Sequence, residues 1–255
     1  YVDNHLVRAA LDDPERATVE GGRAVFIAIV MASHFLRGGY DHDEVVQFVQ
    51  RRIELLSRTA EVRDYAIHLS EAEQGGLPKP WAGKPIIRPE MDPMTGTRPL
   101  PLIHDFYAFA YLPLVRLPEE ARRRLADIVA YVMDERYRSL PEGYGYLWSK
   151  SNRTCYGCGW SVDLPDLDSA NPHQQCRIVQ RMELLARLPG AQDTAWYRKG
   201  LQLLESFRTE RGTYRFPPPY LPEMKTGYYV GGAYMGLEDE RKKAEALELE
   251  STFRM

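Results

Sequence analysis

Apolar residues recur every three or four positions along several stretches of the chain, which is the pattern of amphipathic α-helices. Residues 44–56 and 123–133 each place five apolar side chains on one helical face. The run 24–36 is apolar around its circumference, so we predict a helix buried on nearly all sides, with His34 as a core histidine. The same period predicts further helices over 171–188, 193–207 and 237–253.

No stretch shows the alternation of apolar and polar residues that marks a half-buried strand. The segments between the predicted helices lack this alternation and are rich in Pro, Gly and Tyr. They are residues 77–101, 140–148 and 212–223. Three consecutive prolines, Pro217 to Pro219, exclude a central strand in the last of them. We therefore predict an all-α fold in which helical hairpins are joined by long ordered loops.

A weak internal repeat links residues 134–148 to residues 205–221. Each copy follows an amphipathic helix, carries an aromatic residue followed by Arg, and turns at Gly into a Tyr-rich segment. A single hairpin cannot bury its own apolar stripe, whereas stacked hairpins can. The repeat therefore predicts hairpins that stack against one another.

The succession of a helix, a Gly-aromatic turn and the next helix over residues 17–255 resembles the α/α toroid superfamily. That group includes terpenoid cyclases, protein prenyltransferase β-subunits and carbohydrate-active (α/α)-barrel enzymes. The blocks PEGYGYLW and GTYRFPPPYL are also similar to bacterial proteins of unassigned function. The resemblance implies an α/α toroid or a partial (α/α) barrel. The cyclase Asp-x-Asp-Asp motif and the prenyltransferase zinc ligands have no counterpart here, so no family residue is carried over.

The length and composition fit one soluble globular domain over residues 1–255. A net charge of -3 argues against a nucleic-acid partner, because such domains usually carry a basic excess. The longest apolar run is shorter than the ~20 residues that span a bilayer, and no secretory signal is visible. Three cysteines favour a reducing, cytoplasmic setting. The chain begins with Tyr1 and stops inside an amphipathic pattern, so we expect truncation at both ends.

All three cysteines lie within 22 residues, as Cys155-x-x-Cys158 followed by His173-x-x-Cys176. Three thiolates and one imidazole complete a tetrahedral shell, so these four residues are candidates for one structural zinc. The expected geometry is a Gly-rich turn holding the first pair and a helical first turn holding the second. The alternative is that they are small turn and core residues.

Five residues are candidates for acid and base chemistry. Asp163, Asp166 and Asp168 form an acidic loop between predicted helices, and paired carboxylates of this kind cleave glycosidic bonds. His104 and Asp105 open a predicted helix after a Pro-rich loop, where His104 is a candidate general base. The alternative interpretation is that these aspartates form turns and helix caps.

Aromatic residues gather in the segments between helices. Such side chains line cavities that bind sugars or apolar ligands, or they cover the ends of a core. We predict an enzyme with an aromatic central cavity that performs acid/base chemistry on a glycan or cyclises an isoprenoid-like substrate. The alternative is a non-catalytic helical scaffold that binds a peptide or protein. The expected substrate-lining residues are Tyr144, Tyr146, Trp148, Trp160 and Tyr214.

Overall fold

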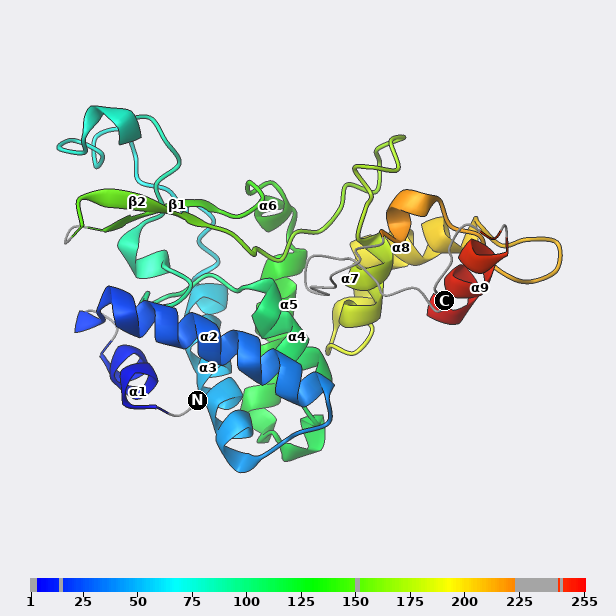
Figure 1. The fold of residues 1–255 in the computed structure, drawn as a ribbon, viewed down its shortest axis with the longest axis horizontal. Helices are drawn as coiled ribbons and strands as arrows, with labels where there is room; N and C mark the ends of the chain where they lie inside the picture. Colours follow the sequence, from blue (N-terminus) through cyan, green and yellow to red (C-terminus); the bar gives the residue numbers. More distant parts are fainter. Residues whose placement is uncertain (1–3, 14–15, 150–151, 223–242, 244) are drawn as a thin grey trace. The chain divides into compact units, whose positions relative to one another are not determined.

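The computed structural model describes residues 4–13, 16–149, 152–222, 243 and 245–255 (Figure 1). The chain divides into two compact units, Tyr1–Asp163 and Leu164–Met255. Each unit is described by itself below.

The helices of the first unit pack in pairs around an apolar core. α2 packs along both α1 and α4, and α3 packs along α5. Buried Val, Ile, Leu and Phe side chains of these helices form the interior. The helices are α1 (His5–Asp12), α2 (Val19–Arg37), α3 (Asp43–Val62), α4 (Ile103–Tyr111), α5 (Glu119–Met133) and α6 (Glu135–Arg138).

The outer face of α2 differs from the prediction. Ile27 is 51% exposed and His34 is also exposed, so burial on nearly all sides and a core histidine were both wrong. His34 instead contacts the carbonyl of Val30 through Nδ1 at 2.8 Å. By length and composition alone α2 is apolar enough to cross a membrane, a test that the core helix of a soluble protein also passes.

A two-stranded antiparallel sheet corrects the all-α prediction. β1 (Gly145–Ser149) pairs with β2 (Thr154–Cys158), with Tyr146 opposite Gly157 and Trp148 opposite Cys155. Tyr, Trp, Thr and Leu favour strands, but the interspersed glycines hide the alternation that would have revealed them. The fold is therefore a mixture of helices and a hairpin, and the described residues do not form the predicted toroid.

The long connection between α3 and α4 runs alongside this hairpin. It contains two short 3-10 helices, η2 (Lys79–Trp81) and η3 (Pro89–Met91). Ile86 forms a parallel bridge with Tyr146 of β1, and Ile87 forms an antiparallel bridge with His68. A third 3-10 helix, η4 (Leu114–Arg116), joins α4 to α5.

The described residues of the second unit form three helices and two short 3-10 turns. They are α7 (Ile178–Leu185), η5 (Ala191–Asp193), α8 (Ala195–Glu205), η6 (Pro218–Tyr220) and α9 (Ala246–Arg254). The helix predicted from residue 171 begins only at Ile178, and hydrogen-bonded turns precede it. Of the helix predicted over 237–253, residues 237–242 and 244 lie outside the described part of the chain.

Candidate ligand-binding site

Asp105, a predicted acid or base, is held in a buried ion pair. Arg52 of α3 donates from Nε to Oδ1 at 3.0 Å and from Nη2 to Oδ2 at 2.9 Å. The backbone N–H of Leu102 donates to the same Oδ2 at 2.9 Å, which ties the carboxylate to the start of α4. Both charged side chains are 1% exposed, so this carboxylate is enclosed and fixes two helices together.

His104 is fully buried between two aromatic rings. Its ring lies 5.5 Å from the ring of Phe26 and 5.5 Å from that of Trp160, both in edge-on arrangements. Burial lowers the pKa of His104 to about 4, against the opposing effect of Asp105. The imidazole is therefore neutral near pH 7 and packs as part of the core.

The three loop aspartates do not form one enclosed group of carboxylates in either unit. Asp163 closes the first unit, whereas Asp166 and Asp168 belong to the second. Asp166 accepts a hydrogen bond from the backbone N–H of Asp168 at 2.9 Å, which is an Asx-type turn. Asp168 is exposed and forms an ion pair with Lys199. Asp166 therefore forms a turn, which was the alternative interpretation of the loop aspartates.

The cysteine geometry differs from the expected metal knuckle. Cys155 and Cys158 lie three residues apart in the extended strand β2, so their side chains point to opposite faces of the sheet. Cys158 is buried and Cys155 is half-buried. His173 and Cys176 lie in turns before α7, not in a helical first turn. Among the described residues no group of three or more His, Cys, Asp or Glu is arranged to hold a metal ion.

Two of the expected substrate-lining tyrosines have structural roles. Tyr144 is fully buried, its hydroxyl contacts the carbonyl of Pro101 and the hydroxyl of Tyr137, and burial raises its pKa well above the usual value. Tyr214 lies in the second unit, where its hydroxyl donates to Glu205 Oε2 at 2.9 Å. Tyr144 is therefore enclosed, whereas Tyr214 is half-exposed.

The structure does bring Tyr146 and Trp148 together. They are two residues apart in β1, so their side chains share one face of the hairpin. Trp81 of η2 packs against Tyr146 with the ring centroids 5.8 Å apart and the planes tilted by 57°. All three rings are half-exposed. We call this face, with Trp81, Tyr146, Trp148 and their cross-strand neighbours Cys155 and Gly157, the aromatic platform.

Small residues leave the aromatic platform open. The cross-strand neighbour of Tyr146 is Gly157, and that of Trp148 is Cys155. Gly157 is exposed, and a Cβ atom added there would meet no atom within 4 Å. A bulky residue at either position would cover the rings, because directly opposed side chains in an antiparallel pair touch. The platform therefore has a shallow floor beside half-exposed rings.

The outer edge of β2 carries unpaired backbone groups. Tyr146 donates its N–H to Pro85 O at 2.9 Å and accepts from the N–H of Ile87 at 2.8 Å, so its backbone groups point away from β2. Residue pairs in an antiparallel ladder alternate between bonded and non-bonded. The pairs Tyr146–Gly157 and Trp148–Cys155 are therefore non-bonded. The N–H and C=O groups of Gly157 and Cys155 point outward, away from β1. No described backbone group outside the hairpin bonds to them.

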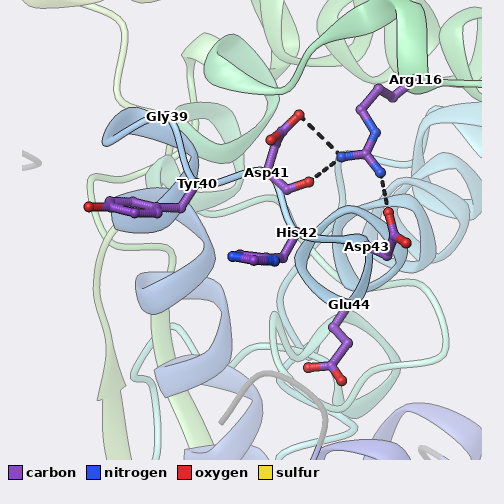
Figure 2. Close-up of a pocket in the computed structure, with 7 residues that line it drawn as sticks. All are labelled: Gly39, Tyr40, Asp41, His42, Asp43, Glu44 and Arg116. Atoms are coloured by element: carbon purple, nitrogen blue, oxygen red, sulfur yellow. Dashed lines mark hydrogen bonds and ion pairs between the residues drawn. The ribbon is translucent and has the colours of Figure 1, made fainter.

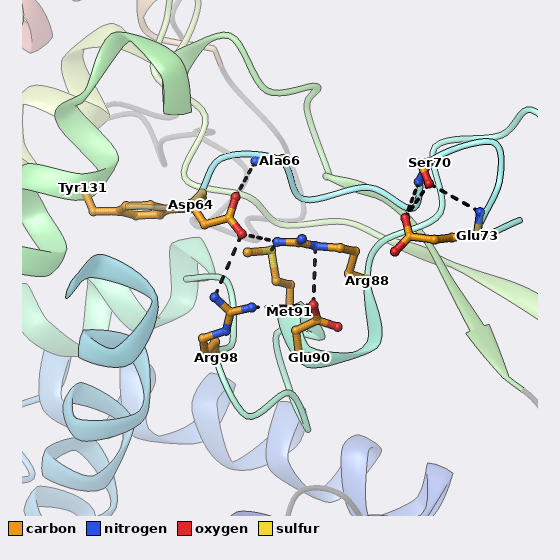
Figure 3. A network of polar contacts seen from close by, with 9 residues as sticks. All are labelled: Asp64, Ala66, Ser70, Glu73, Arg88, Glu90, Met91, Arg98 and Tyr131. Carbon is orange, nitrogen blue, oxygen red and sulfur yellow. Dashed lines mark hydrogen bonds and ion pairs between the residues drawn. The ribbon is translucent and has the colours of Figure 1, made fainter. Parts of the chain in front are cut away.

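Polar contacts fix the connection that supplies Trp81. Gln74 Nε2 donates to Lys84 O at 3.1 Å, and Gln74 Oε1 accepts from the N–H of Gly83 at 2.9 Å. Figure 3 shows the base of this connection, where Arg88 and Arg98 lie between Asp64 and Glu90. These contacts hold the loop in one conformation beside the hairpin.

In the network of Figure 3, Arg88 and Arg98 balance the charges of Asp64 and Glu90. Burial alone would raise the pKa of Asp64, but hydrogen bonds from Arg88 and from the N–H of Ala66 outweigh it and lower that pKa. The hydroxyl of Tyr131 donates to the carbonyl of Asp64 at 3.0 Å, which links α5 to the same point. Nearby, Glu73 accepts from the N–H and hydroxyl of Ser70. The group supports the platform and is itself neutralised.

A separate hollow of the first unit lies at the start of α3. It has a volume of about 620 Å³ and is lined by residues 39–44 and Arg116, which Figure 2 draws. Arg116 binds both Asp41 and Asp43, so one guanidinium offsets part of the negative charge at the start of α3. This hollow contains none of the predicted site residues, and its charges join α3 to η4.

Sequence reasoning identified two rings of the aromatic platform but missed Trp81, Cys155 as a neighbour of Trp148, and the open floor at Gly157. The available signal was the pairing of GYLWS with TCYGC around a four-residue connection. Trp160 is 43% exposed, but its ring packs on His104, apart from the three-ring face.

No protein-family model, curated protein or solved structure matches this chain, so its function is argued from this geometry.

Proposed function

We propose that the first unit is a non-catalytic module that binds an extended peptide segment of a partner protein at the aromatic platform and the outer edge of β2. The single observation that carries the proposal is the coincidence of open rings and unpaired backbone groups on one short hairpin. Cys155 and Gly157 supply both the floor of the platform and the outward N–H and C=O groups.

Strand addition explains how such a site would work. An extended peptide can add a third strand to an exposed sheet edge, and main-chain hydrogen bonds then supply affinity. Its alternate side chains would lie on the platform, beside Tyr146 and Trp148. Aromatic anchors of this kind dominate binding energy at protein interfaces. The backbone groups of β2 would thus supply affinity, and the rings of the aromatic platform would supply specificity.

The predicted acid/base enzyme receives less support from the same residues. Asp105 is paired with Arg52 and enclosed, and His104 is buried and neutral. Asp168 is paired with Lys199 on the surface of the second unit. His104 and Asp105 are thus enclosed, whereas Trp81, Tyr146 and Trp148 are half-exposed.

The test uses the full chain and a displayed library of random peptides of about twelve residues. Selected peptides should bind with a Kd on the order of micromolar, as is usual for short segments. W148A should raise that Kd by about tenfold or more, because an anchor ring is lost. G157P should also weaken binding, since it removes an outward N–H without breaking a ladder bond.

G157A is the matched control for G157P. It keeps the N–H group and places a methyl group where no atom lies within 4 Å, so the fold and the edge are retained. Peptides that bind wild type, W148A and G157P equally well would lie elsewhere, and the proposal would be wrong. Failure to select any peptide would also overturn it.

A further inference from the structure

We infer that the peptide bound at the aromatic platform is acidic; this inference rests on the proposed function and specifies its partner. Residues 74–89 and 143–162 build the platform and contain no Asp or Glu, while Glu73 and Glu90 flank the first range and Glu142 and Asp163 flank the second. The first range carries Lys79, Lys84 and Arg88, and the second carries Lys150 and Arg153. The whole chain has a net charge of -3, so these two ranges are opposite in sign to the chain as a whole.

Three of these cations are available to a ligand. Lys79, Lys84 and Arg153 are exposed, and none forms an ion pair with a described residue. Arg88 differs, because Asp64 and Glu90 neutralise it. Lys150 lies outside the described residues.

The two lysines are attached closely to the platform. Lys79 and Trp81 belong to the same 3-10 turn, and the N–H of Lys84 donates to the carbonyl of Trp81 at 3.2 Å. Arg153 lies in the connection between β1 and β2, and Asn152 beside it is held by a 2.7 Å hydrogen bond to the hydroxyl of Tyr156. Positive charge therefore flanks the platform at the η2 turn and at the hairpin end.

Five other arginines of the first unit are paired, whereas Arg23 and Arg58 are exposed and form no ion pair with a described residue. Arg116, Arg122, Arg123, Arg124 and Arg136 each lie within 4 Å of a carboxylate. Solvated surfaces usually intersperse charges in this way. A group of exposed cations with no acidic residue in its own segments instead produces a positive potential that attracts anionic partners.

An acidic peptide fits this surface better than a nucleic acid does. Aromatic rings with nearby cations also bind single-stranded nucleic acids by base stacking. However, the outward N–H and C=O groups of Cys155 and Gly157 match a peptide backbone, which a nucleic acid cannot pair with in a ladder.

The test compares three capped, fluorescein-labelled octapeptides by anisotropy with the full chain. The probes alternate Tyr with Glu, with Gln or with Lys. At about 50 mM salt the Glu peptide should bind about tenfold or more tightly than the Lys peptide. That preference should shrink at about 300 mM salt, because exposed charges are screened.

Charge-reversal variants test whether Lys79 and Lys84 cause the preference for the Glu peptide. K79E/K84E should reduce binding of the Glu peptide by about tenfold and improve binding of the Lys peptide. The matched control is R23E/R58E, which changes the net charge equally at exposed positions on α2 and α3. The control should change binding by less than about threefold, because its charges lie on other elements.

The outcomes separate the two proposals. If all three peptides bind equally and all lose affinity in W148A, the platform binds peptides but the inference of an acidic partner is wrong. If the Glu peptide binds equally well to wild type, W148A and G157P, the proposed function itself is wrong. If an oligothymidylate binds more tightly than the Glu peptide and depends on Trp148, the ligand is a single-stranded nucleic acid and the inference is overturned.

Discussion

Arg52 of α3 and Asp105 of α4 form a bidentate ion pair in the interior of the first unit, with both side chains 1% exposed. The pair joins two helices that are separated by 40 residues of connection, and the N–H of Leu102 completes the environment of the carboxylate. Removing charges from water costs free energy, so the pair is tolerated only because its partners are well placed.

Breaking this ion pair should destabilise the first unit. We expect D105A to lower the free energy of unfolding by about 3–5 kcal/mol, because it leaves the guanidinium buried without its partner. The double variant R52M/D105L should lose much less, since it removes both charges and keeps the apolar volume. Urea unfolding followed by circular dichroism measures both values. Equal losses in the single and double variants would contradict this account.

The buried His104 predicts a pH dependence of stability. Its pKa is about 4 in the folded chain, below its ordinary value of 6.5, so the unfolded chain binds more protons between these values. Stability should therefore be constant above pH 6.5 and fall as the pH drops toward 4, with a loss of about 2–3 kcal/mol by pH 4.5. Urea unfolding at pH 7 and 4.5 measures the difference.

The control for this pH dependence is H104Q, which cannot titrate. The variant should be less stable at pH 7 but should lose about 2–3 kcal/mol less than wild type on acidification. An unchanged pH dependence in H104Q would show that other groups cause the loss. Proton NMR of the imidazole should place its pKa near 4.

Two glycines of the hairpin should respond in opposite ways to substitution by alanine. Gly145 has a φ of 128°, and an added Cβ would lie 2.2 Å from the carbonyl oxygen of Pro85. G145A should therefore cost about 2–4 kcal/mol through backbone strain and displacement of that segment. G157A meets open space and should change stability by less than about 0.5 kcal/mol. Similar values for both would contradict the described register.

The two thiols of β2 should react at different rates. Burial raises the pKa of both Cys155 and Cys158, and Cys158 is the more enclosed. With a disulfide reagent near pH 8, Cys155 should react more slowly than free cysteine, and Cys158 should react only on unfolding. Addition of EDTA should leave these rates unchanged. Thiols that become reactive only after chelation would instead support the zinc prediction.

Sequence patterns predicted the helices, which depend on local periodicity. They missed features that depend on contacts between residues distant in sequence. The helices over 43–62 and 119–133 follow from their apolar periodicity, and the structure confirms them. The hairpin was missed because its interior glycines carry no side chain to show alternation. Trp81 joins the aromatic platform from a turn more than 60 residues away from β1, and no local pattern encodes that meeting. Asp105 looked catalytic because its partner Arg52 is 53 residues away in sequence.

The open edge of β2 also bears on how the protein avoids self-association. An unpaired strand edge accepts a second copy of the same chain as readily as a partner, which leads to self-association. Exposed lysines and arginines are a common protection against this, because two such edges repel each other. Lys79, Lys84 and Arg153 would serve that purpose here. The same cations that select a ligand of opposite charge would thus keep neighbouring copies apart until that ligand arrives.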